Sequence, residues 1–472
     1  MSDAPEITRR DVVKMAGAAT AIAAAKKIHG APAIQKVRAA NEVVNFAVIG
    51  TGGRGTYLLR HFNGLDGGRC VAVCDIVDEQ LQGAIDTSKD NPEGYKDYRE
   101  LLARTDVDAV IVTVPLYLHF PVTRDALLAG KHVFCEKSLV FKPEETHALR
   151  ALCAERPKQI LQTGLQRRYS RFYQTAKQMV EKGLLGEVTH VRAQWHRNPG
   201  WRMKEFPENQ RVRNWRLFRE YSGGLTAELA SHQIDVSSWM FGHEPEFVVG
   251  VGGLDFMNDG RDVYDNIQLI YSYPNGRKLQ YSSICTNRHL PLFYGERNEF
   301  GEIIMGTEGT VHITVGADAE PTLGIWFYDP RPEEVAKAEE QAQEEGKPAI
   351  AGATLASTGK GVRGWPILFD EEQVTGEESF LSRELKYAKM WLYQKGVMVP
   401  EERNPVDTSL LGFFESVRTG KRPLADLEVG LQDSTAVMLS NLAMDEGRRI
   451  YMNEIDEMGL DKVEEAMSRQ IV

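Results

Sequence analysis

The most constraining stretch of the sequence is an apolar run that leads directly into a glycine-rich turn. Residues 43–49 are mostly apolar, with β-branched side chains, which predicts a buried strand. Gly50, Gly52 and Gly55 follow in the pattern G-x-G-x-x-G, and residues 56–62 have the composition of a helix. The first glycine permits a tight turn, the second lets the backbone approach a pyrophosphate, and the third lets helix pack on strand. This order predicts a dinucleotide site with the phosphates at the helix N-terminus.

An acidic residue stands at the end of the next predicted strand. Residues 70–75 read CVAVCD, and Asp75 lies about 20 residues beyond Gly55, the usual distance to the acid that binds the ribose hydroxyls. A carboxylate at this place would repel the 2′-phosphate of NADP, so the sequence favours NAD. The alternative interpretation is a glycine turn followed by an aspartate that only caps a helix.

Strands and helices alternate regularly through the first third of the chain. Further buried strands are predicted at 108–114 and 132–138, and helices at 97–104 and 121–129. This alternation predicts an α/β Rossmann domain, a doubly wound parallel sheet, over residues 42–160.

The pattern changes after Gln162, where longer strands replace the regular alternation. The predicted elements are helices at 172–182 and 225–241, strands at 186–196, 265–273 and 277–285, and an irregular segment at 198–221. Asn275-Gly276 between two of these strands is a hairpin signal. We expect a C-terminal α+β domain over residues 161–400, with a large open mixed or antiparallel sheet and a partly ordered insertion at 321–400. Closing helices are expected within 401–460.

Composition excludes some classes of protein. The chain has 472 residues, enough for two or three domains, and a formal charge of −11. That charge argues against a nucleic-acid partner. The five cysteines have no metal-like spacing, so we expect buried thiols and no metal site.

The N-terminal residues resemble an export signal. Arg9-Arg10 precede a mild apolar core at 15–25, and Ala31-Pro32-Ala33 supplies small residues for cleavage. The core is too short to span a bilayer of about 30 Å, and no later segment is a candidate span. We expect a twin-arginine signal peptide over residues 1–33 and a periplasmic or exported protein. The alternative is an amphipathic helix with a chance arginine pair.

Two further stretches carry ionisable groups in suggestive places. Glu136 and Lys137 end a predicted strand, where open α/β sheets place ligands, and a partly desolvated lysine can exchange a proton. Position alone also fits an ordinary surface lysine. Glu228 and His232 are four residues apart on a predicted helix, so they share a face suited to acid–base chemistry, and Asp235 could orient the imidazole. The alternatives are a core histidine, or a metal pair that lacks a third ligand.

These motifs, in this order, resemble the glucose–fructose oxidoreductase/inositol dehydrogenase (Gfo/Idh/MocA) family. The resemblance runs from about Val43 to Tyr451 outside the insertion, and includes YKDYRELL, VPLYLHFPVTRDALLAGKHVFCEK, GLLGEV, GTEGTV and SVRTGKRPLADLEVG. It implies an NAD-dependent oxidoreductase whose open sheet makes the contact of a homo-oligomer, a dimer or tetramer. The chain departs from the family at Ser138, where proline is usual, and at Glu228, where aspartate is usual.

The resemblance also implies roles for individual residues. Lys137 and His232 would contact the reacting hydroxyl, with Glu228 in support. The expected cofactor-binding residues are Gly50, Gly52, Gly53, Arg54, Gly55, Asp75, Pro115, His119, Glu136 and Lys137. The expected substrate-binding residues are Arg168, Trp201, Trp215 and Asp235, with help from Arg202, Arg213 and Arg216. The two tryptophans equally fit a structural loop packed on the core.

An export signal and a nicotinamide site conflict unless the cofactor is captive. We therefore expect tightly bound NAD, loaded before export and recycled in the site, and a small-molecule sugar or glycoside as substrate. One alternative is an NAD-dependent glycoside hydrolase that works by oxidation, elimination and reduction. Another is a catalytically silent sugar-binding protein on the same fold.

Overall fold

The computed structural model describes residues 43–197, 201–206, 210–286, 300–315, 321–328, 363–369, 392–401 and 403–469. The predicted signal peptide and much of the predicted insertion lie outside the described residues.

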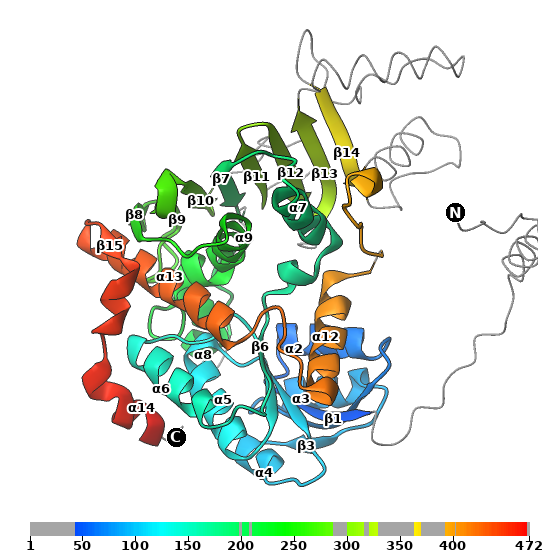
Figure 1. Ribbon diagram of the computed structural model, residues 1–472. Helices are drawn as coiled ribbons and strands as arrows, with labels where there is room; N and C mark the ends of the chain where they lie inside the picture. Colours follow the sequence, from blue (N-terminus) through cyan, green and yellow to red (C-terminus); the bar gives the residue numbers. More distant parts are fainter. Residues whose placement is uncertain are drawn as a thin grey trace, which may run out of the picture. The chain divides into compact units, whose positions relative to one another are not determined.

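A parallel sheet of six strands forms the first half of the fold (Figure 1). Its strands are β1 (Val44–Ile49), β2 (Gly68–Cys74), β3 (Glu93–Tyr95), β4 (Ala109–Val112), β5 (His132–Cys135) and β6 (Leu161–Thr163). Their order is β3-β2-β1-β4-β5-β6, and every neighbouring pair is parallel. The order reverses between β1 and β4, which is where open sheets of this kind bind ligands.

Helices cover both faces of the parallel sheet. On β1, Phe46 and Val48 pack toward α2 (Gly53–Phe62) and α12 (Pro405–Thr419), while Ala47 and Ile49 belong to the cluster on the opposite face. That face is covered by α4 (Tyr98–Leu102), α5 (His119–Leu128), α6 (Pro143–Ala154) and α14 (Val463–Ser468). The remaining helix of this half is α3 (Asp78–Thr87). Burial on both faces explains why the strands are apolar at nearly every position.

The second sheet has nine strands and is mixed. They are β7 (Val188–Trp195), β8 (Phe247–Gly253), β9 (Asn266–Ser272), β10 (Lys278–Ile284), β11 (Phe300–Gly306), β12 (Gly309–Val315), β13 (Pro321–Tyr328), β14 (Arg363–Phe369) and β15 (Ile450–Tyr451). The order is β14-β13-β12-β11-β7-β10-β9-β8-β15; only the β7–β10 pair is parallel. The predicted fold class is thus confirmed.

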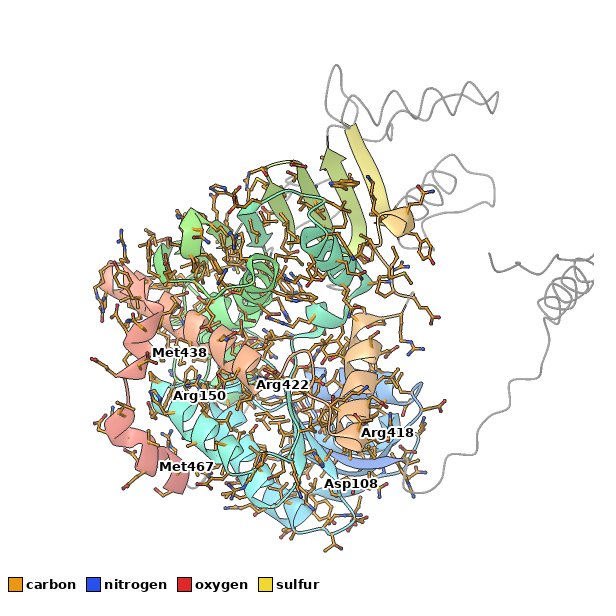
Figure 2. The ribbon with its side chains drawn as sticks, viewed as in Figure 1. Asp108, Arg150, Arg418, Arg422, Met438 and Met467 are labelled. Atoms are coloured by element: carbon orange, nitrogen blue, oxygen red, sulfur yellow. The ribbon has the colours of Figure 1, made fainter. Side chains whose placement is uncertain are left out.

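Three helices cover one face of the mixed sheet, α7 (Arg171–Glu181), α9 (Ser231–Phe241) and α13 (Leu427–Glu446). Helix α13 also reaches the parallel sheet, because Met438 packs against the hydrophobic clusters of both sheets (Figure 2). At its first turn Glu428 pairs with Arg150 of α6 at 3.1 Å. No helix in the described ranges is both long and apolar enough to cross a membrane.

Several elements differ from the expectations. No element was expected from the sequence at α3, α6 or β8, and the predicted insertion contributes β13 and β14 to the edge of the mixed sheet. The helix expected at 225–241 is a π-helix over Thr226–Ala230 followed by α9. The other short helical elements are α8 (Gln210–Arg213) and 3₁₀ turns at Leu116–Leu118, Gln166–Tyr169, Trp215–Leu217, Pro274–Gly276, Met452–Asp456 and Leu460–Lys462.

Candidate functional site

The glycine-rich turn after β1 has the geometry of a phosphate cradle. Gly50 has φ +90°, and a Cβ there would lie 2.7 Å from the Val114 nitrogen. A Cβ on Gly55 would overlap the carbonyl oxygen of Gly50, whereas one on Gly53 would meet nothing within 4 Å. Helix α2 begins here with no side-chain cap and no acid in its first turn. Its free N–H groups therefore fit an anionic pyrophosphate.

Asp75 ties the end of β2 to this turn. One carboxylate oxygen accepts the Thr51 N–H at 2.7 Å and the Thr51 hydroxyl at 3.2 Å, and the other accepts the Val77 N–H at 2.9 Å. A carboxylate has about four acceptor positions, so capacity remains for a ribose hydroxyl. Asp75 does not cap α3, whose N-cap is Val77 and has no side-chain cap bond, so the alternative interpretation was wrong; the Asp75 carboxylate closes the turn before that helix and lines the cleft.

A cavity of about 580 Å³ runs along the carboxyl ends of β1, β2 and β4. One wall holds the glycine-rich turn, Asp75 and Pro115, and the other is built by residues within 201–206 and 212–217. Trp201, Trp215 and the arginines expected to help, Arg202, Arg213 and Arg216, all lie in this second wall. The two tryptophans are also partly buried against the core of the mixed sheet, so both interpretations describe them.

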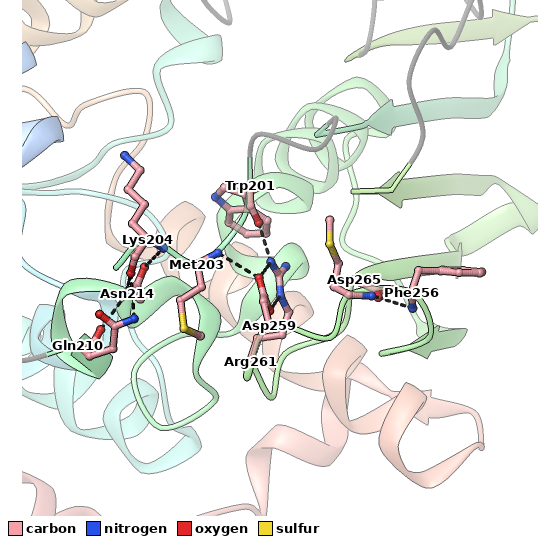
Figure 3. Close-up of polar contacts among 10 residues, drawn as sticks. Trp201, Met203, Lys204, Gln210, Asn214, Phe256, Asp259, Arg261 and Asp265 are labelled. Carbon is pink, nitrogen blue, oxygen red and sulfur yellow. Dashed lines mark hydrogen bonds and ion pairs between the residues drawn. The ribbon is translucent and has the colours of Figure 1, made fainter. Parts of the chain in front are cut away.

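The second wall is anchored by its main chain (Figure 3). Arg261, whose side chain is fully buried, donates to the carbonyl of Trp201 at 2.7 Å and pairs with Asp259. Asp259 in turn accepts the Met203 N–H at 3.0 Å, and Asn214 bonds both the N–H and the carbonyl of Lys204. Arg202 and Lys204 of this segment take no part in these bonds through their side chains, and both line the cleft.

The amine of Lys137 lies at the carboxyl end of β5, where it meets the π-helix. Its Nζ donates to the main-chain carbonyls of Ala227 at 2.9 Å and Glu228 at 2.6 Å. Burial lowers the pKa of Lys137, and the carboxylates of Glu228, Glu136 and Asp433 oppose the shift. A neutral amine has two hydrogens and one lone pair, so two carbonyl acceptors leave the lone pair for a substrate hydroxyl. The Lys137–Ser138 peptide bond is cis.

The Glu228 side chain turns toward the second wall of the cleft. It pairs with Arg216 at 2.8 Å and accepts the Ser222 hydroxyl at 3.3 Å. The π-helix is defined by bonds such as Ser231 N–H to Thr226 O, and segments of this kind are frequent at functional sites. Glu228 and His232 therefore do not stand one α-helical turn apart, as the sequence spacing predicted.

His232 is 4% exposed, and its ring stacks on Trp195 with 5.7 Å between centroids. Burial, together with the charges of Lys137, Arg167 and Arg54, lowers the pKa of His232, which keeps the imidazole neutral. Beneath the stack, Arg167 and Glu302 form a buried ion pair, and Tyr173 donates to Glu302 at 2.6 Å. This network holds Trp195, because the Arg167 guanidinium lies 5.3 Å from the indole ring.

The sequence suggested that Asp235 orients the imidazole of His232, and the structure shows a different partner for Asp235. Its carboxylate accepts two bonds from Arg168 Nε, at 2.8 and 3.1 Å, and pairs with Arg168 Nη2 at 2.6 Å. Arg168 and Asp235, both expected to bind substrate, are therefore each other's main partners. The charges of Asp235 and Arg168 both act on a third group, the carboxyl of Asp433, which was not expected from the sequence. No motif in the sequence marks that residue.

Two expected cofactor residues have partners within the protein. His119 places Nδ1 2.7 Å from the Ser138 carbonyl and Nε2 2.9 Å from the Val114 carbonyl. It therefore braces the segment after Lys137 and the strand end beside Pro115. Glu136 accepts from Arg54 Nε at 2.7 Å, which links the glycine-rich turn to the end of β5. Within the described ranges, no group of three or more His, Cys, Asp or Glu side chains is placed to hold a metal ion.

Comparisons with known proteins agree with this geometry. Residues 44–164 match the oxidoreductase family with an NAD-binding Rossmann fold, and residues 173–312 match the GFO/IDH/MocA C-terminal domain. The crystal structure of aldose-aldose oxidoreductase from Caulobacter crescentus superposes with a TM-score of 0.61 at 20% identity, covering 87% of this chain and 99% of that one.

Two curated relatives are similar in sequence. The 2,7-anhydro-N-acetylneuraminate hydratase of Mediterraneibacter gnavus is 28% identical over 66% of this chain and 77% of its own length. The alpha-N-acetylgalactosaminidase of Shewanella oneidensis is 31% identical over 45% of this chain and 50% of its own. For several such relatives the chain spans about half of their length or less. Because both halves of the fold match its domain profiles, the chain belongs to the Gfo/Idh/MocA family of oxidoreductases and has an NAD-binding Rossmann domain.

Proposed function

We propose that the protein oxidises a hydroxyl group of a sugar or glycoside, using an NAD that stays bound and is recycled in the site. The observation that carries the proposal is the Lys137 amine, held by the carbonyls of Ala227 and Glu228 just beyond the carboxyl end of β5. Names of the similar proteins include an aldose-aldose oxidoreductase and enzymes acting on amino sugars, which supports a carbohydrate substrate.

The chain's own residues supply the proton chemistry. Lys137 takes the hydroxyl proton on its lone pair and returns it in the reverse step, since burial lowers the pKa of Lys137 and so favours the neutral amine. The neutral imidazole of His232 orients the same hydroxyl. Arg216, paired with Glu228, and Trp215 lie where a sugar would contact the second wall. NAD, when bound, accepts and gives back the hydride.

Retention of the cofactor is supported by the charge of the cleft. Arg202, Lys204 and Arg213 line the wall opposite the uncapped start of α2. Arg54 and Arg216, by contrast, are already paired with Glu136 and Glu228. Cations facing a pyrophosphate form charge-assisted hydrogen bonds, which would slow release.

A second candidate function is glycoside hydrolysis by oxidation, elimination and reduction. The similarity to an alpha-N-acetylgalactosaminidase and to a hydratase favours it, since neither name describes a net redox reaction. In this scheme Lys137 handles the hydroxyl proton, and the neutral His232 accepts a proton from the adjacent carbon. A silent sugar-binding protein remains the candidate from another class, and the intact Lys137 site argues against it.

We further propose that the chain is exported through its Arg9-Arg10 leader and works as a homo-oligomer. Export explains why a captive cofactor would be useful. Val251 and Ile270 are exposed on the mixed sheet, which offers an apolar surface to a second copy.

The deciding experiment is a screen of purified, dialysed protein against free sugars and glycosides with no added NAD. Activity that does not rise with added NAD supports a captive cofactor. One oxidised and one reduced product indicate sugar oxidoreduction, while hydrolysis in deuterated water with deuterium next to the oxidised carbon indicates the glycosidase. Strict dependence on added NAD, with stoichiometric NADH, contradicts both.

A further inference from the structure

Helix α13 carries a carboxyl group that the proposed chemistry does not use. Asp433 is 3% exposed, and no hydrogen bond of ordinary geometry reaches either carboxylate oxygen from the described residues. An isolated buried carboxylate is costly, so such a group must either hold a proton or face a positive charge. Asp433 therefore needs a physical explanation.

The helix places Asp433 beside the catalytic segment. Its neighbour Ser434 accepts the N–H groups of Leu139 at 2.9 Å and Val140 at 3.3 Å, so this turn of α13 docks on the residues that follow Lys137. The hydroxyl of Ser138 is buried and has no other partner among the residues that the structure describes, and it lies close enough to Asp433 to act on the carboxyl.

The charges around Asp433 leave one available counter-ion. Asp433 is influenced by Asp235 on α9, by Arg168 on the 3₁₀ turn after β6, and by Lys137 at the end of β5. Arg168 is committed to Asp235, with three contacts between 2.6 and 3.1 Å. Lys137 is thus the cation left for Asp433. Lys137 itself also faces Glu136, Glu228 and Arg216.

Burial acts on the two groups in opposite directions. It raises the pKa of Asp433, helped by the negative charge of Asp235, and it lowers the pKa of Lys137. The two groups also act on each other electrostatically, and interacting groups titrate as a pair rather than separately.

We propose that Asp433 and Lys137 hold one proton between them, so that Asp433 acts as a positioning residue that sets the basicity of Lys137. Before the reaction the pair carries no proton, with a carboxylate on Asp433 and a neutral amine on Lys137. The hydroxyl proton of the substrate is the one proton that the pair takes up, and the Asp433 carboxylate stabilises the Lys137 ammonium that forms. In the reverse step the same proton returns to the substrate. This inference rests on the proposed role of Lys137 as a base.

The test measures the titration of Lys137 directly and needs no substrate. Wild type, Asp433→Asn and Asp433→Glu are acetylated by trace acetic anhydride across a range of pH, and modification of the peptide containing Lys137 is read by mass spectrometry. We expect Asp433→Asn to lower the pKa of Lys137 by about one unit, since a nearby opposite charge shifts a pKa by one or more units. Asp433→Glu, which keeps a carboxyl, should restore most of the shift.

A matched control lies on the same helix. Asp445 pairs with Arg219 at 2.7 Å and accepts from Tyr264 at 2.6 Å, far from Lys137 in sequence and in its contacts, so Asp445→Asn should leave the titration unchanged. In parallel, the rise of kcat/KM with pH should shift to lower pH in Asp433→Asn, by the same number of pH units as the titration of Lys137.

The outcomes separate this inference from the proposed function. An unchanged Lys137 titration in folded Asp433→Asn overturns the shared proton, even if Lys137→Ala is inactive. A shifted titration together with a fully active Lys137→Ala leaves the shared proton standing and removes the proposed function. Asp433→Asn that cannot fold at all also counts against the inference, because the loss of one unpartnered charge should not prevent folding.

Discussion

The amine of Lys137 donates to the main-chain carbonyl of Glu228 over 2.6 Å, which joins the end of β5 to the π-helix that precedes α9. The contact ties a residue that follows β5 of the Rossmann sheet to the segment that leads into α9, one of the helices that cover the mixed sheet. It also assigns the Glu228 backbone, rather than its carboxylate, as the partner of the lysine.

Lys137→Ala should lower turnover by about a hundredfold or more, because it removes a proton-transferring group. NAD content, measured by mass spectrometry of the denatured protein, should be unchanged. Lys131→Ala is the matched control, since the Lys131 amine also donates to two main-chain carbonyls, those of Arg104 at 2.6 Å and Val107 at 2.9 Å. Equal turnover in the two variants would remove Lys137 from the mechanism.

The rate of hydroxyl oxidation should rise with pH and level off below the ordinary lysine pKa of 10.5. The sign follows from the chemistry: the neutral amine is the active form, and burial lowers the pKa of Lys137, so the active form appears at lower pH. A profile of kcat/KM against pH measures the pH at which this rise levels off. A limb at or above 10.5 would show that the amine is not desolvated in the working enzyme.

Gly55→Ala should abolish cofactor binding and lower the melting temperature, because its Cβ would overlap the Gly50 carbonyl and crowd Thr113 Oγ1 at 2.9 Å. Gly53→Ala, whose Cβ meets nothing within 4 Å, should melt like the wild type when both are compared without cofactor. Differential scanning fluorimetry measures the melting temperatures of both variants. Similar melting of the two variants would contradict the tight turn.

Lys204→Glu combined with Arg202→Glu should raise the Kd for NAD about tenfold or more, since both residues line the cleft opposite the start of α2. Lys158→Glu combined with Arg69→Glu, two exposed sites outside the cleft, controls for the change in net charge. NAD remaining after dialysis in salt is the measurement. Wild-type retention in the double variant would remove the second wall as the source of tight binding.

The free energy of unfolding should fall as pH drops from 6.5 toward 4, and His196 should account for part of the loss. Its Nδ1 accepts the Ile284 N–H at 3.1 Å, and burial lowers its pKa from 6.5 to about 4. Between these values the unfolded chain binds a proton that the folded chain does not, so acid favours unfolding, by up to about 3 kcal/mol for this group.

His196→Asn keeps an acceptor for Ile284 and removes the titration. Denaturant unfolding at several pH values should therefore give this variant a flatter pH dependence than the wild type below pH 6.5. An identical slope would mean that His196 is protonated in the folded protein.

Much of the first half of the fold could be predicted because its signals are local. The apolar run before Gly50, the glycine spacing and Asp75 each reflect constraints within a few residues, and the structure places them around one cleft. The same holds for Lys137, whose position at a strand end follows from the order of strands in a parallel sheet.

The second half carried weaker signals. The sequence between Leu225 and Phe241 is helical in composition, but it does not show that the first turns form a π-helix. In the structure this π-helix is the part of the segment whose carbonyls bind Lys137. The prediction that Glu228 and His232 share one face of an α-helix was therefore wrong, since four residues make about one turn of an α-helix but less than one turn of a π-helix.

The sequence by itself determined the doubly wound domain, the dinucleotide motif and the candidate base, since each depends on residues close together in the chain. The tertiary structure decided which charges meet: Arg168 with Asp235, Arg54 with Glu136, and Asp433 near Lys137. These partners are separated by tens to hundreds of residues, and no local pattern in a single sequence indicates such distant contacts. Their pairing is fixed only when burial removes the water that would otherwise screen each charge.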